Sequence, residues 1–141
     1  MFIPRKAKYK KAFKGRVKGN TKGGSDLVFG DYGLKAVGVA RINSNQIEAA
    51  RRTIVKVLRS NNKKFKLWIR IFPNIPVSKK PADVRMGKGK GSVEFWVFRV
   101  SPGRILFEVS NVPIDLVKIA FDKASSKLPI GCKLISDCNI L

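Results

Sequence analysis

The stretch NSNQIEAARRTIVKVLRS, residues 43–60, carries the clearest fold signal in the chain. Its first four residues contain an N-x-x-Q start, Asn43 to Gln46, which resembles a capping box and is typical of a helix N-terminus. Apolar side chains then recur at helical spacing on one face. These are Ile47, Ala50, Ile54, Val57 and Leu58. We therefore expect an amphipathic helix whose apolar face packs on a core.

Segments with strand character surround this helix. LWIRIF, residues 67–72, alternates with period two, as a half-buried strand does. Residues 93–100 and 104–109 are interpreted as two more strands, and the SPG between them predicts a tight hairpin. Short apolar runs cut by glycine in residues 27–42 indicate two short strands, and residues 132–141 a final one.

A second helix is expected over residues 113–128, with Pro113 at its start. Together these elements predict the α+β class. We expect one compact domain, residues 25–141, with a mixed, mainly antiparallel sheet and two helices. The rest of the chain is a basic N-terminal arm, residues 1–24, and a long loop, residues 73–92. A loop of about twenty residues without secondary structure is unusual in a compact domain and usually functional.

The charge points to a polyanionic partner. The chain has 30 Lys and Arg against 9 Asp and Glu, a formal net charge of +21. Nucleic acid is the usual partner of such a charge, and we favour it over an anionic membrane. No apolar run approaches the roughly 20 residues needed to span a bilayer, so no membrane partner is expected.

The arm carries much of this charge. Nine basic residues and no acid occur in residues 1–24, and Phe2, Tyr9 and Phe13 interrupt them. One reading is a solvated, disordered tail. We favour an arm that orders on RNA, with its cations on phosphates and its aromatic rings anchored to RNA or to the protein body.

The residue inventory argues against an enzyme. The chain has no histidine, which removes the commonest general base and metal ligand. Cys132 and Cys138 have no third or fourth partner for zinc and are interpreted as reduced thiols. We expect no metal and no cofactor.

The segment DVRMGKGKGSVEFW, residues 83–96, resembles a phosphate cradle. It departs from the Walker pattern, and a strand rather than a helix is expected after it, which disfavours nucleotide hydrolysis. Lys88 and Lys90 can supply point charges to phosphates, and Arg85 can grip a phosphate or stack on a base. A mobile surface loop is the alternative. The basic stripe on the first helix, Arg52, Lys56 and Arg59, is equally interpretable as a solvated face or as a phosphate-facing one.

Several collinear segments extend this picture to a family. They are KGRVKG, FGDYGLKAVGVARI, QIEAARR, LWIRIFPNIPVSKKPADVRMGKGKGSVEFWV, PGRILFE and KLPI. On these segments, nearly the whole chain resembles the bacterial-type large-subunit ribosomal protein number sixteen, the universal L-sixteen family. The resemblance implies a structural protein that binds large-subunit rRNA below the central protuberance and helps position tRNA near the aminoacyl site. Neighbouring large-subunit ribosomal proteins are then further partners.

The resemblance also assigns residues. The loop matching residues 79–92 points toward tRNA in the family, so the tRNA-proximal residues are Arg85, Met86, Lys88 and Lys90. The expected rRNA-binding residues are Arg5, Lys6, Lys8, Lys10, Lys11, Lys14, Arg16, Lys18, Lys22, Arg51, Arg52, Lys56, Arg59, Lys79 and Lys80. The alternative function is a free RNA-binding chaperone or regulator that is not integral to the ribosome.

The most specific inference concerns the compartment of the cell. The start of the chain aligns with the family's own start, so no presequence is expected. Lysines outnumber arginines two to one, and Ile and Asn are frequent, which favours an AT-rich gene. VSPGRI and PVSKKPADVRMGKGKG resemble the proteobacterial and mitochondrial branch. We expect an organelle-encoded protein of the mitochondrial large ribosomal subunit, with the bacterial cytoplasm as the alternative.

Overall fold

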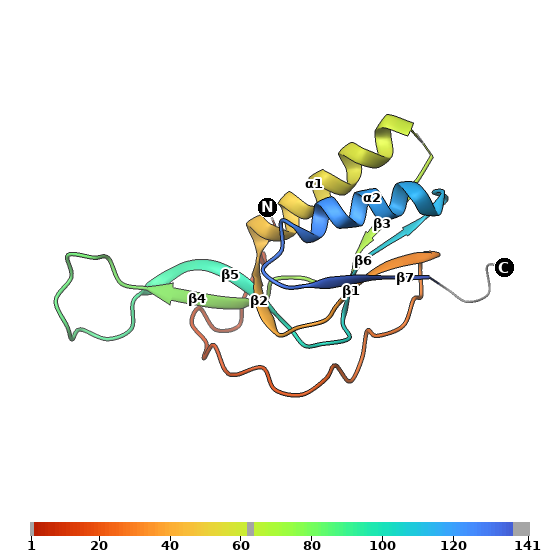
Figure 1. The fold of residues 1–141 in the computed structure, drawn as a ribbon. Coiled ribbons are helices and arrows are strands. Elements are labelled where there is room, and N and C mark those ends of the chain that lie inside the picture. The colour runs from red at the N-terminus through yellow and green to blue at the C-terminus, as the bar shows by residue number, and fades with distance from the viewer. Residues whose placement is uncertain (1, 62–63, 137–141) are drawn as a thin grey trace.

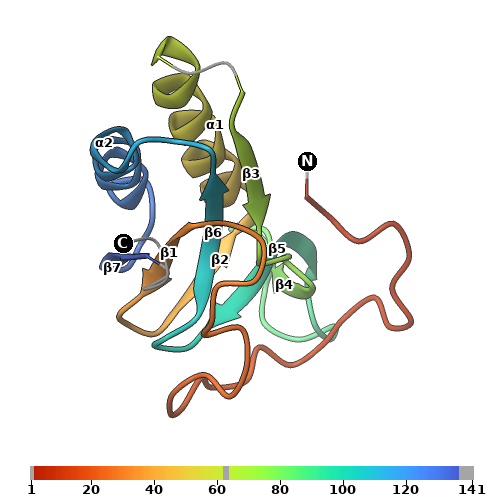
Figure 2. The same ribbon diagram turned by 90° about the vertical axis from the view of Figure 1, so that its right-hand side faces the viewer.

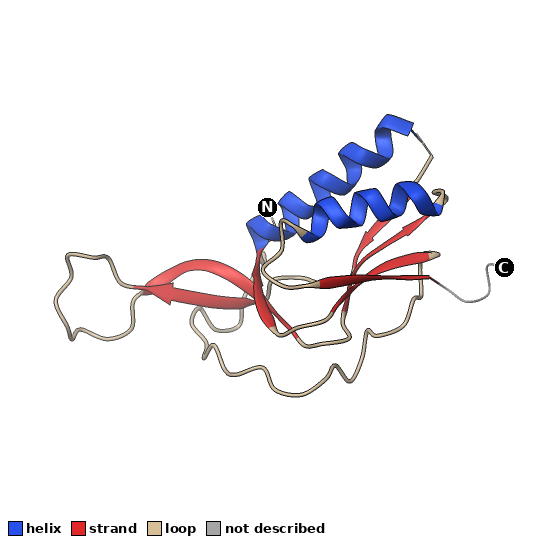
Figure 3. Ribbon diagram, in the orientation of Figure 1, coloured by secondary structure: helices blue, strands red, loops and turns tan. Residues whose placement is uncertain are grey.

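The computed structural model describes residues 2–61 and 64–136 and has two helices and two sheets (Figures 1 and 3). The four-stranded sheet has the order β3-β6-β1-β7, and the three-stranded sheet the order β2-β5-β4. Every strand pair is antiparallel. The strands are β1 Tyr32–Ala36, β2 Ala40–Asn43, β3 Lys66–Ile69, β4 Ile75–Lys79, β5 Ser92–Val100, β6 Ile105–Ser110 and β7 Cys132–Ser136. The α+β class is confirmed, although the strands divide between two sheets where one was expected.

Helices α1, Ser44–Asn61, and α2, Ile114–Ser125, lie side by side on one face of the four-stranded sheet (Figures 1 and 2). The predicted face of α1 is confirmed: Ile47, Ala50, Ile54 and Leu58 are fully buried, and Val57 packs at the edge of the core. On α2, the buried residues are Val117, Ala120, Phe121 and Ala124. These faces meet Leu34, Phe107 and Val109 of the sheet. Each such side chain stabilises the fold by about 2 kcal/mol through its burial.

The helix ends follow their local chemistry. The side chain of Gln46 accepts a hydrogen bond from the Asn43 amide at 2.9 Å, which is the returning half of a capping box. The Asn43 side chain instead accepts from the Ser44 hydroxyl at 3.1 Å. Pro113 is the N-cap of α2. The helix ends at Ser125, three residues before the expected end, and the amides of Lys127 and Leu128 then bond three residues back, in a tighter turn.

The predicted hairpin between residues 93–100 and 104–109 is wrong. A tight turn does join β5 and β6, but β5 belongs to the three-stranded sheet and β6 to the four-stranded sheet. Gly103 has φ +91°, and its amide donates to the carbonyl of Ala36 at 2.8 Å. The turn is therefore used to pass from one sheet to the other, and each strand pairs with partners distant in sequence.

The expected unstructured loop at residues 73–92 is also corrected. Its first part contains β4, which pairs with β5 and holds Pro76 opposite Trp96. The proline disfavoured a strand assignment, since it cannot donate to a ladder. It is tolerated because β4 is an edge strand with one neighbour. The connection without regular structure is the shorter one between β4 and β5.

The other strand predictions hold with shifted ends. The strand expected at residues 67–72 ends at Ile69, although the Arg70 amide still donates to the Leu106 carbonyl at 2.9 Å. In residues 27–42, β1 begins only at Tyr32, and β1 and β2 lie in different sheets. The final strand is confirmed to Ser136, and its predicted remainder, including Cys138, lies outside the described residues.

Candidate nucleic-acid interface

The N-terminal arm lies along the side of the four-stranded sheet opposite the two helices (Figures 1 and 2). It is bonded to the turn between β5 and β6. The Thr21 amide donates to the Pro102 carbonyl at 3.0 Å, and the Ile105 amide donates to the Gly24 carbonyl at 2.9 Å. Phe2 packs against the core. The free protein therefore already places this arm against the body, which a detached tail would not do.

Arginines on the strands hold the middle of the arm. Arg41 of β2 and Arg99 of β5 are directly opposite in the antiparallel register, an arrangement that like charges disfavour. Both turn to arm carbonyls: Arg41 Nη2 donates to Gly15 O at 2.5 Å, and Arg99 Nη2 donates to Phe13 O at 2.9 Å. Gly15 has φ +63°, and a Cβ there would lie 2.8 Å from Arg99 Nη2. Glycine therefore suits the positive φ where the arm crosses these arginines, and a side chain there would displace the Arg99 guanidinium.

The loop between β4 and β5 projects from the body at the far end of the three-stranded sheet (Figure 1). Its neck is narrow, since a Cβ on Gly91 would lie 2.5 Å from the Lys79 carbonyl oxygen. Its turn places Gly87, Lys88 and Gly89 in succession at positive φ, at +103°, +58° and +81°. These angles explain the glycines on both sides of Lys88, because residues other than glycine seldom adopt a positive φ.

The predicted tRNA-proximal residues, Arg85, Met86, Lys88 and Lys90, are all exposed on this loop, and Met86 is 100% exposed. Two of the predicted rRNA residues, Lys79 and Lys80, lie at its base. Lys80 Nζ donates to the Gly87 carbonyl at 2.5 Å. Lys79 lies 3.8 Å from Glu94, a carboxylate that is itself half exposed. The loop therefore carries exposed cations along its length, and Lys80 at its base bonds back to its turn.

The arm and the loop are joined by a reciprocal pair of hydrogen bonds. Lys11 Nζ donates to the Lys90 carbonyl at 2.8 Å, and Lys90 Nζ donates to the Ala12 carbonyl at 2.8 Å. The Lys90 ammonium also lies 5.5 Å from the centroid of the Phe13 ring. Two groups of residues that the sequence places about 80 positions apart therefore form one basic surface.

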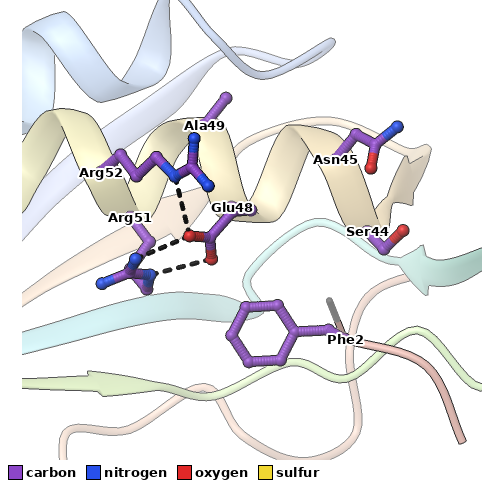
Figure 4. Close-up of a pocket in the computed structure, with 7 residues that line it drawn as sticks. All are labelled: Phe2, Ser44, Asn45, Glu48, Ala49, Arg51 and Arg52. Atoms are coloured by element: carbon purple, nitrogen blue, oxygen red, sulfur yellow. Dashed lines mark hydrogen bonds and ion pairs between the residues drawn. The ribbon is translucent and has the colours of Figure 1, made fainter.

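The stripe on α1 is a separate surface. Arg52, Lys56 and Arg59 are exposed on the helix, on the opposite side of the four-stranded sheet from most of the arm. Arg51 is only partly exposed and, with Arg52, binds Glu48 (Figure 4). Arg51 Nη2 donates to Glu48 Oε1 at 2.6 Å, and Arg52 Nε to the same oxygen at 3.0 Å. The structure therefore does not bring this stripe together with the loop.

The hydrogen bond from Arg51 has the largest effect on the Glu48 carboxyl and lowers its pKa to about 2. The same hydrogen bond raises the pKa of the Arg51 guanidinium. Phe2 approaches the pair across a hollow of about 610 Å³ that also includes Ser44, Asn45 and Ala49 (Figure 4). Since the charge of Arg51 is already partly neutralised, Lys56 and Arg59 are better placed to meet phosphates than Arg51.

Four arginines and one glutamate with a role in this surface escaped the sequence analysis. Glu108 of β6 is fully buried, and its Oε2 accepts from the amides of Phe29 and Gly30 at 2.7 and 2.9 Å and of Val28 at 3.3 Å. Its Oε1 accepts from Arg70. A single acid within the apolar strand ILFEVS was the available signal. The other three arginines, Arg41, Arg99 and Arg104, contact the arm, and no local pattern marks them.

Metal binding, a reactive thiol and a membrane span were considered for the described residues. Among them, no group of three or more His, Cys, Asp or Glu residues could hold a metal ion. Burial raises the pKa of the Cys132 thiol to about 11, which makes it a poor nucleophile. Within the same described ranges, neither helix is long and apolar enough to cross a membrane.

Comparison with known proteins identifies similar chains. The family model described as ribosomal protein L16p/L10e matches residues 4–135. The large ribosomal subunit protein uL16 of Erythrobacter litoralis is 56% identical over 136 residues, which cover 96% of this chain and 92% of the relative. The protein of the same name from Sphingopyxis alaskensis is 57% identical over 136 residues, which cover 96% and 93%.

Proposed function

Because the chain belongs to the ribosomal protein L16p/L10e family, we propose that it is a structural constituent of the large ribosomal subunit that binds large-subunit rRNA and neighbouring ribosomal proteins. Members of this family are structural components of the ribosome and not enzymes. The observation that carries the proposal is the family match over residues 4–135, which includes the arm, both sheets and the loop. The free RNA chaperone considered from the sequence receives no support from these relatives.

The proposed mechanism is electrostatic. Lys and Arg side chains of the arm, residues 1–24, neutralise rRNA phosphates and release condensed counterions, which makes binding strongly dependent on salt. The fold supports this role because Arg41, Arg99 and Arg104 already donate to arm carbonyls in the free protein. The arm is thus already ordered against the body, and less conformational entropy is lost when it meets RNA.

The loop carries a finer proposal. Arg85, Met86, Lys88 and Lys90 are proposed to face tRNA near the aminoacyl site. Support comes from their exposure and from the projection of the loop beyond the three-stranded sheet (Figure 1). Lys88 and Lys90 supply point charges, and the Arg85 guanidinium can grip one phosphate with two donors.

The first experiment tests integration into the ribosome. Native extract is separated on a sucrose gradient, and the chain is followed in subunits, whole ribosomes and free fractions. We expect co-migration with the large subunit through a high-salt wash. A chain found only at the top of the gradient, or removed by mild salt, would contradict the ribosomal role and favour a free RNA-binding protein.

A second experiment separates the loop from the arm. The double variant Arg85→Ala/Lys88→Ala is expected to join the large subunit normally and to slow tRNA accommodation. The matched control is Lys118→Ala/Lys123→Ala, which also removes two exposed charges. Both lysines are on α2, which covers the side of the four-stranded sheet away from the arm. Loss of the loop variant from the particle would make the loop an rRNA anchor instead.

The most specific proposal concerns the compartment: a mitochondrial location, with the bacterial cytoplasm as the alternative. The high ratio of lysine to arginine supports an AT-rich gene, whereas both relatives named above are bacterial and fit the alternative. Fractionation of a eukaryotic source organism would test it, since the chain should follow the mitochondrial ribosomes. Its recovery from a bacterial ribosome would overturn the mitochondrial assignment alone.

A further inference from the structure

Phe13 is an aromatic side chain that the fold leaves uncovered. The residue is 91% exposed, although it belongs to a segment that is hydrogen-bonded to the body. Phe2, at the beginning of the same arm, packs against the core. The arm therefore contains two kinds of phenylalanine, one that anchors the arm and one that is presented to solvent.

The backbone that presents Phe13 is fixed on both sides. The carbonyls of Ala12, Phe13 and Gly15 accept hydrogen bonds from Lys90, Arg99 and Arg41. These three donors come from the loop, from β5 and from β2, so the segment is attached to separate parts of the fold. A ring on a fixed backbone loses little freedom when a ligand packs on it, which favours binding.

One cation lies over the ring, and three others are close to it in sequence. The Lys90 ammonium lies 5.5 Å from its centroid, and Lys11, Lys14 and Arg16 are close in sequence. An apolar protein surface packed on Phe13 would have to remove these charges from water, at a large cost. A nucleic-acid strand offers both needed chemistries, because a base can stack on the ring while its phosphates neutralise the lysines.

We propose that Phe13 is a stacking platform for an unpaired RNA base at the junction of the arm and the loop, with Lys11, Lys14 and Lys90 on the adjoining phosphates. The inference rests on the proposed rRNA-binding function and specifies the form of RNA at this position. Duplex RNA keeps its bases within the helix, so the ligand is a single-stranded loop, bulge or end.

The test is the binding of purified full-length protein to a labelled single-stranded oligoribonucleotide, and to the same strand carrying abasic sites. We expect Phe13→Ala to weaken binding to the intact strand by about tenfold or more. It should leave binding to the abasic strand unchanged, because stacking needs both the ring and a base. Phe13→Trp should restore the preference for the intact strand.

Two control variants separate stacking from charge. Lys14→Ala should weaken both strands equally and reduce the slope of log affinity against log salt by about 0.7. Tyr9→Ala should have a smaller effect than Phe13→Ala, since the Tyr9 ring is already less exposed, at 70%. Thermal unfolding should be unchanged in all of these variants, because each side chain is exposed in the arm.

Two results would overturn the proposal. If Phe13→Ala weakens both strands equally, the ring acts by placing the neighbouring lysines. If it weakens neither, no base stacks there. Either result leaves the ribosomal function intact when the chain still co-migrates with the large subunit. The two conclusions are therefore tested separately.

Discussion

The two sides of the four-stranded sheet are stabilised by different contacts. Helices α1 and α2 cover one side with side chains such as Ile54, Leu58 and Phe121, which are buried almost completely. The arm lies on the other side, and the cations that hold its backbone carbonyls come mainly from outside this sheet: Arg41 and Arg99 from the three-stranded sheet, Lys90 from the β4–β5 loop and Arg104 from the turn before β6. One side is complete within the protein, whereas the other uses groups that also bind phosphate.

This difference has a consequence for RNA binding. A phosphate oxygen is a charged acceptor and forms stronger hydrogen bonds with arginine than a neutral carbonyl does. Each guanidinium has five N–H donors, so we expect Arg41 and Arg99 to bind RNA phosphates through their remaining donors while they keep their contacts with the arm. The apolar contacts beneath the helices include no such donors, so their contribution should be the same in the free and bound protein.

The largest effect is expected on the helix side. Phe107→Ala would remove a ring that is fully buried beneath the helices and should lower the free energy of unfolding by about 3–5 kcal/mol. Urea unfolding of the free protein measures this loss. Phe13→Ala is the matched control on the arm side and should change stability by less than about 0.5 kcal/mol. Equal losses would contradict the division between the two sides.

The next effect is expected at Glu108, which connects the sheet to residues 28–30. Glu108→Gln keeps the shape but removes the charge that Arg70 binds and places an amide against backbone donors. We expect a loss of about 2–3 kcal/mol, together with faster hydrogen exchange at Phe29 and Gly30. Glu94→Gln is the control. The Glu94 carboxylate is 46% exposed and lies 3.8 Å from Lys79, which makes a weak ion pair, so this substitution should leave the free energy of unfolding nearly unchanged.

A smaller effect on stability is expected at the contact between the arm and the loop. Lys90→Ala removes the ammonium that binds the Ala12 carbonyl and should cost under about 1 kcal/mol. The backbone of residues 80–91 and 11–15 should nevertheless become more mobile, as measured by NMR order parameters. Lys123→Ala on α2 should leave both segments unchanged. A loop unaffected by Lys90→Ala would show that the arm does not hold it.

The smallest effect concerns pH. The pKa of Glu48 is lowered from 4.5 to about 2, so its ionised form is favoured by folding. This stabilisation is fully present above pH 4.5 and is lost as the pH falls toward 2. It should amount to less than about 1 kcal/mol, because Arg52 is 75% exposed and solvent screens the pair. The stability difference between wild type and Glu48→Gln should therefore shrink below pH 4.5; a constant difference would contradict the assignment.

Local patterns predicted the helix side well. The apolar spacing of α1 is set within one segment, so its buried face followed from the sequence, as did the existence and start of α2. β4 was missed because Pro76 disfavours a strand unless that strand lies at an edge, and edge position depends on the whole sheet. The hairpin prediction failed for a related reason, since turn chemistry at residues 101–103 does not determine which sheet each strand joins.

The site shows the same limit. The basic arm, the loop and their cations were identified from composition and glycine spacing. Their attachment to each other was not, because the bonds between Lys11 and Lys90 and between Arg99 and Phe13 join distant parts of the chain. Nor does a strand sequence show that Arg41 and Arg99 lie opposite each other.

The hydrogen bonds from Arg99 and Arg104 to the arm also determine when the arm can attach during protein synthesis. Arg99 donates to the Phe13 carbonyl and lies 86 residues after it. Arg104 donates to the Gly23 carbonyl and lies 81 residues after it. At the usual rate of translation, about 5–20 residues per second, they follow the arm by roughly 4–17 s. The arm is thus made before the residues that hold it, and these carbonyl contacts can form only once Arg99 and Arg104 have been made. Throughout that interval the nascent arm carries nine cations with no folded surface to hold them.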